Sequence, residues 1–129
     1  MDVGELNGDR AMTGQDADTR LDCQVEQRAH AIVVSVTGAV DLTTQGIFAD
    51  AVAEALRGQA MVVIIDLADV KFMSSPGLAV LVDAHENAMR AHKVVHIAIG
   101  TGVVKRSIDV TGLGEILSLV PDVQTALER

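Results

Sequence analysis

Aromatic residues are almost absent from this sequence of 129 residues, which has two phenylalanines, Phe48 and Phe72, and no tryptophan or tyrosine. A buried core must therefore be aliphatic, built from Val, Ile, Leu, Ala and Met. Surfaces that stack bases or sugars depend on aromatic rings, so the scarcity of rings argues against both kinds of surface.

Cysteine and positive charge are also scarce. Cys23 is the only cysteine, which excludes an internal disulfide and a cysteine-based metal site. Ten basic residues stand against eighteen acidic ones, so the formal net charge is −8. Nucleic acids and anionic membrane surfaces require a basic footprint, and we expect neither as a partner.

Long apolar runs are missing as well, since none approaches the roughly 18 residues that a membrane-spanning helix needs. The first residues carry acids where a secretory signal peptide has bases, so we expect a cytoplasmic protein. Residues 1–19 are polar, acidic and without periodicity, and we interpret them as a disordered tail. Residues 20–129 form the expected single folded domain.

Alternating and helical apolar patterns predict the elements of this domain. The short link around Arg28 and His30 makes the first two strands an antiparallel hairpin. The order β-β-α-β-α-β-α-β-α predicts an α/β fold, a small mixed β-sheet opened by a hairpin, with helices packed on it. Strands are expected at 21–27, 31–40, 60–67, 94–100 and 115–120, and helices from Thr43 or Thr44 to Gly58, from Ser75 to near His92, from Thr101 and from Pro121.

Apolar residues at three- and four-residue spacing predict the buried face of each helix. The three sets expected to face inward are Ile47, Phe48, Val52 and Leu56; Leu78, Leu81, Val82, His85 and Met89; and Val103, Val104, Ile108 and Val110.

Catalytic and metal-binding patterns are not found. The serines lie in "FMSSPG", which lacks the G-x-S-x-G of a nucleophile elbow. The histidines (His30, His85, His92 and His96) pair with no Asp, Glu or Cys at metal-ligand spacing. Cys23 lies in the apolar phase of a strand, which favours a small core residue over a nucleophile. We therefore expect no catalysis and no cofactor.

The stretch "MSSPGL" lies between a predicted strand and a predicted helix. Ser75 is a good N-cap and Pro76 suits the first helical position, so capping alone explains the pair. The N-terminus of a helix also favours negative charge, so an exposed hydroxyl there is well placed to carry a phosphate. Both interpretations are open at this point.

Three stretches, in order, resemble the STAS domain of bacterial anti-sigma-factor antagonists. The family's G-E-[IL]-D-L-x-[ST] is similar to "VTGAVDLTT" (36–44), although Ala39 stands where the family has Glu. Its strand, D-L, F-[IM]-D-S-[SA]-G-L and helix resemble "VVIIDLADVKFMSSPGLAVL" (62–81). Its last segments resemble "VKRSIDVTGLGEILSLVPDVQTAL" (104–127). The resemblance covers roughly residues 20–129.

The resemblance implies a binding protein rather than an enzyme. Members of this family bind an anti-sigma factor, often a serine kinase, and release a sigma factor to RNA polymerase. In many of them the kinase phosphorylates the serine before Gly-Leu, the complex dissociates, and a phosphatase restores binding. Here Pro76 occupies that position and Ser74 stands where the family has Asp. The candidates for phosphorylation are therefore Ser75 and, as a weaker one, Ser74.

The resemblance also implies a partner-binding surface, made by Asp41, Thr43, Ser74, Ser75, Gly77 and Leu78. Asp41 could instead be a turn or capping acid, and Leu78 a packing residue. Two other functions remain open. One is a STAS module that senses a small ligand or scaffolds another complex without phosphorylation, which Pro76 favours. The other is a small hydrolase that uses Ser75, for which the sequence offers no base.

Overall fold

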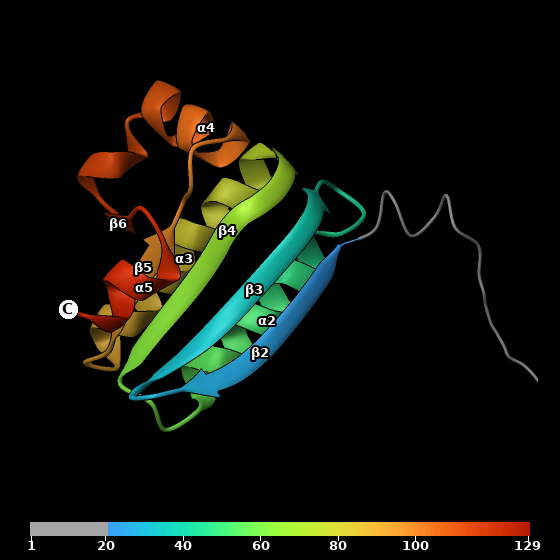
Figure 1. Ribbon diagram of the computed structural model, residues 1–129. Helices are drawn as coiled ribbons and strands as arrows, with labels where there is room; N and C mark the ends of the chain where they lie inside the picture. Colours follow the sequence, from blue (N-terminus) through green and yellow to red (C-terminus); the bar gives the residue numbers. More distant parts are fainter. Residues whose placement is uncertain (1–20) are drawn as a thin grey trace, which may run out of the picture.

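Five strands form one mixed sheet in the order β2-β3-β4-β5-β6 (Figure 1). The computed structural model describes residues 21–129, and the tail predicted over residues 1–19 lies outside them. β2 is antiparallel to β3, and every other pair is parallel. The predicted α/β fold with an opening hairpin is confirmed. The strands are β2 (Asp22–Arg28), β3 (Ala31–Val40), β4 (Val62–Met73), β5 (Val94–Ala98) and β6 (Ser118–Val120).

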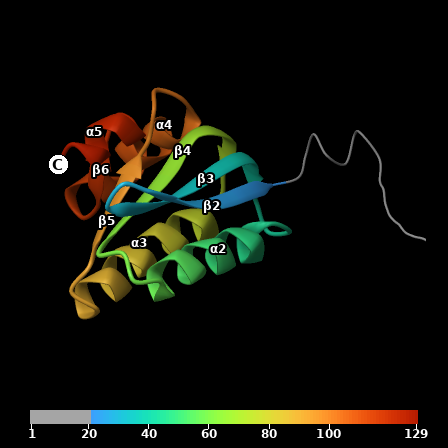
Figure 2. The ribbon, with the colours of Figure 1, turned by 60° about the horizontal axis from the view of Figure 1, so that its bottom comes forward.

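The helices cover both faces of the sheet. Figure 2 shows α2 and α3 side by side beneath one face, with α5 on the opposite side. α4 lies against the carboxyl end of β4 (Figure 1). Among the helices of residues 21–129, none is long and apolar enough to cross a membrane. Their bounds are α2 (Gln45–Arg57), α3 (Ser75–Arg90), α4 (Val103–Thr111) and α5 (Val123–Leu127), with the 3-10 helix η1 at Leu113–Glu115.

The main core lies between the sheet and α2 and α3, and it is aliphatic apart from Phe48, which is fully buried. The inner faces of the strands contribute Val and Ile, while α3 contributes Leu81 and two alanines. A smaller cluster around Ile64 and Val120 packs against Ala126 of α5. Both faces of the central strands are covered by helices. This explains why the first part of β4 is a continuous apolar run in the sequence.

Three apolar residues predicted to face inward lie on the surface instead. Ile47, Met89 and Val110 are 50%, 62% and 81% exposed. In α3 the buried stripe passes through Ala84 and Ala88, two small residues that a search for large apolar side chains overlooks. In α4 the spacing of Val104 and Ile108 by four residues already defines the inward face, and Val110 falls outside it.

β4 is longer than predicted, because it continues past residue 67 to Met73. Its pairing with β3 shifts register twice, between Ser35 and Thr37 and between Gly38 and Ala39. β4 carries the extra residue at each bulge, which bends the strand and interrupts the alternation that a regular strand would show. Gly38 takes a φ of +115°, a value that favours glycine. The extension brings the end of β4 beside the end of β3.

Candidate functional site

The first turn of α3 is capped by Ser74, not by Ser75 as predicted. The Oγ of Ser74 accepts a hydrogen bond of 3.1 Å from the backbone N–H of Gly77. Ser74 has extended backbone angles, and Ser75 is the first helical residue. Pro76 therefore falls at the second helical position, where its missing N–H also costs no helical hydrogen bond. The hydroxyl of Ser75 is left on an exposed residue.

The loop before α2 is ordered by the carboxylate of Asp41. Its Oδ1 accepts hydrogen bonds from the N–H and hydroxyl of Thr43, at 2.8 and 2.7 Å, and from the N–H of Thr44 at 3.2 Å. These bonds, led by that from the Thr43 hydroxyl, hold the pKa of Asp41 below its ordinary value. The interpretation of Asp41 as a turn acid is supported.

Thr44 occupies the N-cap position of α2, but its side chain does not cap the helix. The prediction that this helix starts at Thr43 or Thr44 is therefore confirmed at Thr44, although no side-chain hydrogen bond accompanies the cap. The Thr44 hydroxyl donates to the carbonyl of Ala39 at 2.7 Å and accepts from the N–H of Asp41 at 2.9 Å. Because Thr44 is only 6% exposed, these bonds satisfy a buried polar group and fasten the loop to the end of β3.

The two stretches singled out in the sequence meet at the ends of β3 and β4. The backbone N–H of Ser74 donates a hydrogen bond of 2.9 Å to the carbonyl of Val40. Gly77 lies so close to β3 that an added Cβ would come within 2.7 Å of Val40 Cγ1 and 2.5 Å of Met73 Sδ. The loop at 41–44 and the junction at 74–78 therefore form one surface, which we call the junction corner.

The six predicted partner-binding residues differ in how far they reach the surface of the junction corner. Thr43 and Ser75 are exposed, whereas Asp41 and Ser74 are partly buried. Gly77 is buried and Leu78 is 7% exposed, so both support the corner by packing beneath it. For Leu78 this agrees with the alternative interpretation from the sequence, that of a packing residue.

A groove next to the junction corner contains residues that the sequence analysis did not single out. It lies between the first turn of α3 and helix α4 and has a volume of about 310 Å³. We call it the α3–α4 groove. The signal available in the sequence was the spacing of Val110 two residues after Ile108, which does not place both on one helix face. The groove is lined by Met73, Ser75, Leu78, Arg106, Ser107, Val110 and Thr111.

The surroundings of Ser75 and Cys23 do not support a role for either as a nucleophile. The part of the chain that the structure describes places no His, Asp or Glu in the lining of the α3–α4 groove that could act as a base for Ser75. Burial, with a smaller effect from Asp22, raises the pKa of the Cys23 thiol to about 11, which makes it a poor nucleophile. Within residues 21–129, no group of three or more His, Cys, Asp or Glu residues could hold a metal ion.

The pKa of His96 is lowered mainly by burial and also by the charge of Arg129. Its Nδ1 lies 2.8 Å from the hydroxyl of Ser118. The two side chains belong to β5 and β6, strands that pair at the far edge of the sheet from β2. This pair is therefore separate from the junction corner.

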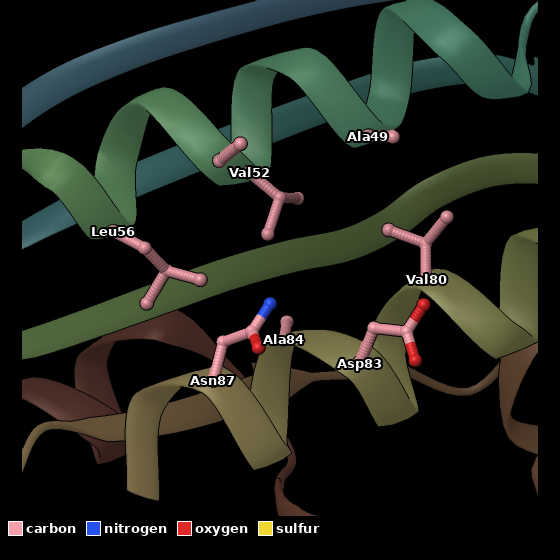
Figure 3. A pocket seen from close by; sticks show the side chains of 8 residues that line it. Ala49, Val52, Leu56, Val80, Asp83, Ala84 and Asn87 are labelled. Atoms are coloured by element: carbon pink, nitrogen blue, oxygen red, sulfur yellow. The ribbon is translucent and has the colours of Figure 1, made fainter. Parts of the chain in front are cut away.

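A second hollow lies between α2 and α3 (Figure 3). Its volume is about 220 Å³, and Ala49 and Ala84 leave the space between the helices. Asp83 and Asn87 supply its polar groups, and among the described residues its lining offers no second acid, histidine or cation to work with the Asp83 carboxylate. We therefore attribute this hollow to loose packing of the two helices.

Comparisons with known proteins agree with this geometry. Residues 23–121 match a family model described as "Mlab, STAS domain". The chain is 30% identical over 95 residues to the anti-sigma-F factor antagonist RsfB of Mycobacterium tuberculosis, covering 74% of this chain and 77% of RsfB. An anti-sigma factor antagonist from Mycobacterium paratuberculosis aligns with a TM-score of 0.78 and 27% identity, over 84% of this chain and 92% of that one. Unphosphorylated SpoIIAA shares the fold, with a TM-score of 0.69 and 16% identity over 84% and 95% of the two chains.

Proposed function

Because this chain belongs to the STAS-domain family, we propose that it is an anti-sigma-factor antagonist. Its junction corner binds an anti-sigma factor, and the sigma factor that this partner held is released. The observation that carries the proposal is the hydrogen bond from Ser74 to Val40, which joins the two sequence stretches into one surface. We assign residues 20–129 to the STAS domain, and the role needs no catalytic step.

The partner we propose is an anti-sigma factor of the serine-kinase type. Ser75 is the acceptor of the phosphate, because it is exposed while the Oγ of Ser74 is engaged with Gly77. Pro76 has no hydroxyl, so the position that carries the phosphate in the family is closed here. A phosphatase would return the chain to its binding form.

A phosphate on Ser75 would change the junction corner strongly. It would add a charge of about −1.5 to −2 in the first turn of α3, where the helix N-terminus favours an anion. The start of α3 therefore accommodates a phosphate on Ser75. The surface that contacts the partner, however, becomes bulkier and more negative. Release of the partner follows from this change of the surface rather than from unfolding.

The net charge of −8 supports a protein partner over nucleic acid or an anionic membrane surface. The cytoplasm is the compartment in which such a partner and the sigma factor would be met. The protein partner and the cytoplasmic location are both part of the proposed function.

A second function is a STAS module that senses a small ligand or scaffolds another complex, and Pro76 is the observation that favours it. Small-molecule sites usually enclose about 300–1,000 Å³. The α3–α4 groove, at about 310 Å³, is at the lower end of that range. Native mass spectrometry of protein isolated from cells distinguishes the two functions, since only the second expects a retained ligand.

The proposal is tested with purified complexes of each sigma factor and anti-sigma factor of the source organism. Adding the full chain should displace one sigma factor, and adding ATP should reverse the displacement if the anti-sigma factor is a kinase. If no complex releases its sigma factor at saturating concentrations, the proposed antagonist role is wrong.

A further inference from the structure

We propose that α4 supplies the second half of the docking surface. The α3–α4 groove takes a segment of the anti-sigma factor in which an apolar side chain enters between Leu78 and Val110 and a neighbouring carboxylate pairs with Arg106. The inference rests on the proposed function, because it names the chemistry of that partner.

Val110 provides the apolar contact. It is 81% exposed, the largest exposed fraction among the described large apolar residues, and it lines the groove. Its neighbours on the groove floor, Met73 and Leu78, are 6% and 7% exposed. An apolar side chain placed here would cover Val110 and touch the edge of the core. Removing such a side chain from water favours the complex, so the contact contributes to affinity.

Arg106 provides the charge. Among the described residues it is the only charged one in the lining of the groove, and it lies in a chain with a net charge of −8. The neighbouring Lys105 forms an ion pair with Asp109 at 3.0 Å, and in residues 21–129 Arg106 takes part in no such pair. An arginine on the rim of an apolar groove is complementary to a carboxylate, which it can bind through two parallel hydrogen bonds.

The groove is continuous with the junction corner through Ser75, which lines the groove and belongs to the first turn of α3. A partner that binds the junction corner can therefore contact α4 as part of the same continuous surface. The same continuity links the groove to regulation, because a phosphate on Ser75 would compete with the carboxylate of the partner for Arg106.

The test measures binding of the full chain to the purified anti-sigma factors of the source organism, by titration calorimetry at two salt concentrations. The groove variants are Arg106→Glu and Val110→Asp. Two controls match them: Lys105→Glu reverses a charge on the same helix outside the groove lining, and Met89→Asp adds a charge at an exposed apolar residue on α3. All four variants are checked by thermal unfolding, so that weak binding is compared only among folded proteins.

We expect each groove variant to weaken binding at least tenfold and each control to change it less than twofold. The affinity of the wild type should fall with added salt more steeply than that of Arg106→Glu. If the wild type binds and all four variants bind equally well, the groove is not part of the interface, although the proposed function stands. If the wild type binds no anti-sigma factor, both proposals fail.

Discussion

The N–H of Ser74 donates a hydrogen bond to the carbonyl of Val40, and this bond extends the pairing of β3 with β4 into the first turn of α3. The side chain of the same serine caps the helix through the N–H of Gly77. One residue thus links the end of β3 to the start of α3. These two bonds hold the start of α3 against the end of β3, and a surface organised before binding suits recognition by another protein.

Gly77→Ala should destabilise the chain, because the new Cβ would meet Met73 Sδ and Val40 Cγ1 at distances below 3 Å. Overpacking of this kind costs about 1–3 kcal/mol in the free energy of unfolding. Urea denaturation measures the loss. The control is Gly46→Ala, where no atom lies within 4 Å of the added Cβ and a small stabilisation is expected. Equal stability of the two variants would contradict the close approach.

Asp41→Asn should make stability less dependent on acidic pH. The folded pKa of Asp41 lies below its ordinary value of 3.8, chiefly because of the hydrogen bond from the Thr43 hydroxyl. Such a carboxylate stabilises the fold above its unfolded pKa, and the stabilisation is lost as the pH falls through the folded pKa.

The unfolding free energy of the Asp41→Asn variant should therefore be lower than that of the wild type at pH 7, with the difference closing below about pH 4. Chemical denaturation over this range of pH gives the comparison. Asp50→Asn, on the exposed side of α2, is the matched control at pH 7. A difference that stays constant with pH would show that the ionised form of Asp41 does not order the loop.

Ser74→Ala and Ser75→Ala should separate stability from modification. Losing the Ser74 cap should cost about 0.5–2 kcal/mol, whereas the change at the exposed Ser75 should stay within about 0.5 kcal/mol. After incubation with the partner kinase and ATP, peptide mapping should find phosphate in Ser74→Ala and none in Ser75→Ala. A phosphate that persists in Ser75→Ala would assign the acceptor to another residue. Pro76→Ser should gain a further site.

Cys23 should react slowly with thiol reagents in the folded chain. Its pKa is raised from 9.0 to about 11, so the reactive thiolate is about a hundredfold less populated at a given pH below 9. Ellman's reagent at pH 8 measures the rate. The same chain unfolded in urea is the control and should react about a hundred times faster. Comparable rates in the two states would mean that the thiol is not shielded by the fold.

The fold was predictable because its signals are local and agree with one another. The apolar run before Asp66 predicted the central strand, and the short link between the first two strands predicted the hairpin, as observed. The end of β4 was missed because its two bulges depend on pairing with β3, a relationship that single residues do not reveal. Ser75 was predicted to cap α3, but the longer β4 places Ser74 at that position.

The candidate site was predicted in part. Asp41 and the serines were found because turn acids, caps and the family resemblance mark them in the sequence. Arg106 and Val110 were not, since the surface they form exists only where α4 packs beside the start of α3. Val110 was assigned to the core because it is apolar and follows Ile108 closely in the sequence. A spacing of two residues, however, does not place two side chains on the same face of a helix.

The proposed function depends most on where the partner binds. Hydrogen exchange of the full chain, with and without the anti-sigma factor whose complex it disrupts, measures this directly. We predict slower exchange at residues 41–44 and 74–78 in the complex. Protection confined to α5 or to the β2–β3 hairpin, with the junction corner unchanged, would contradict binding at the junction corner.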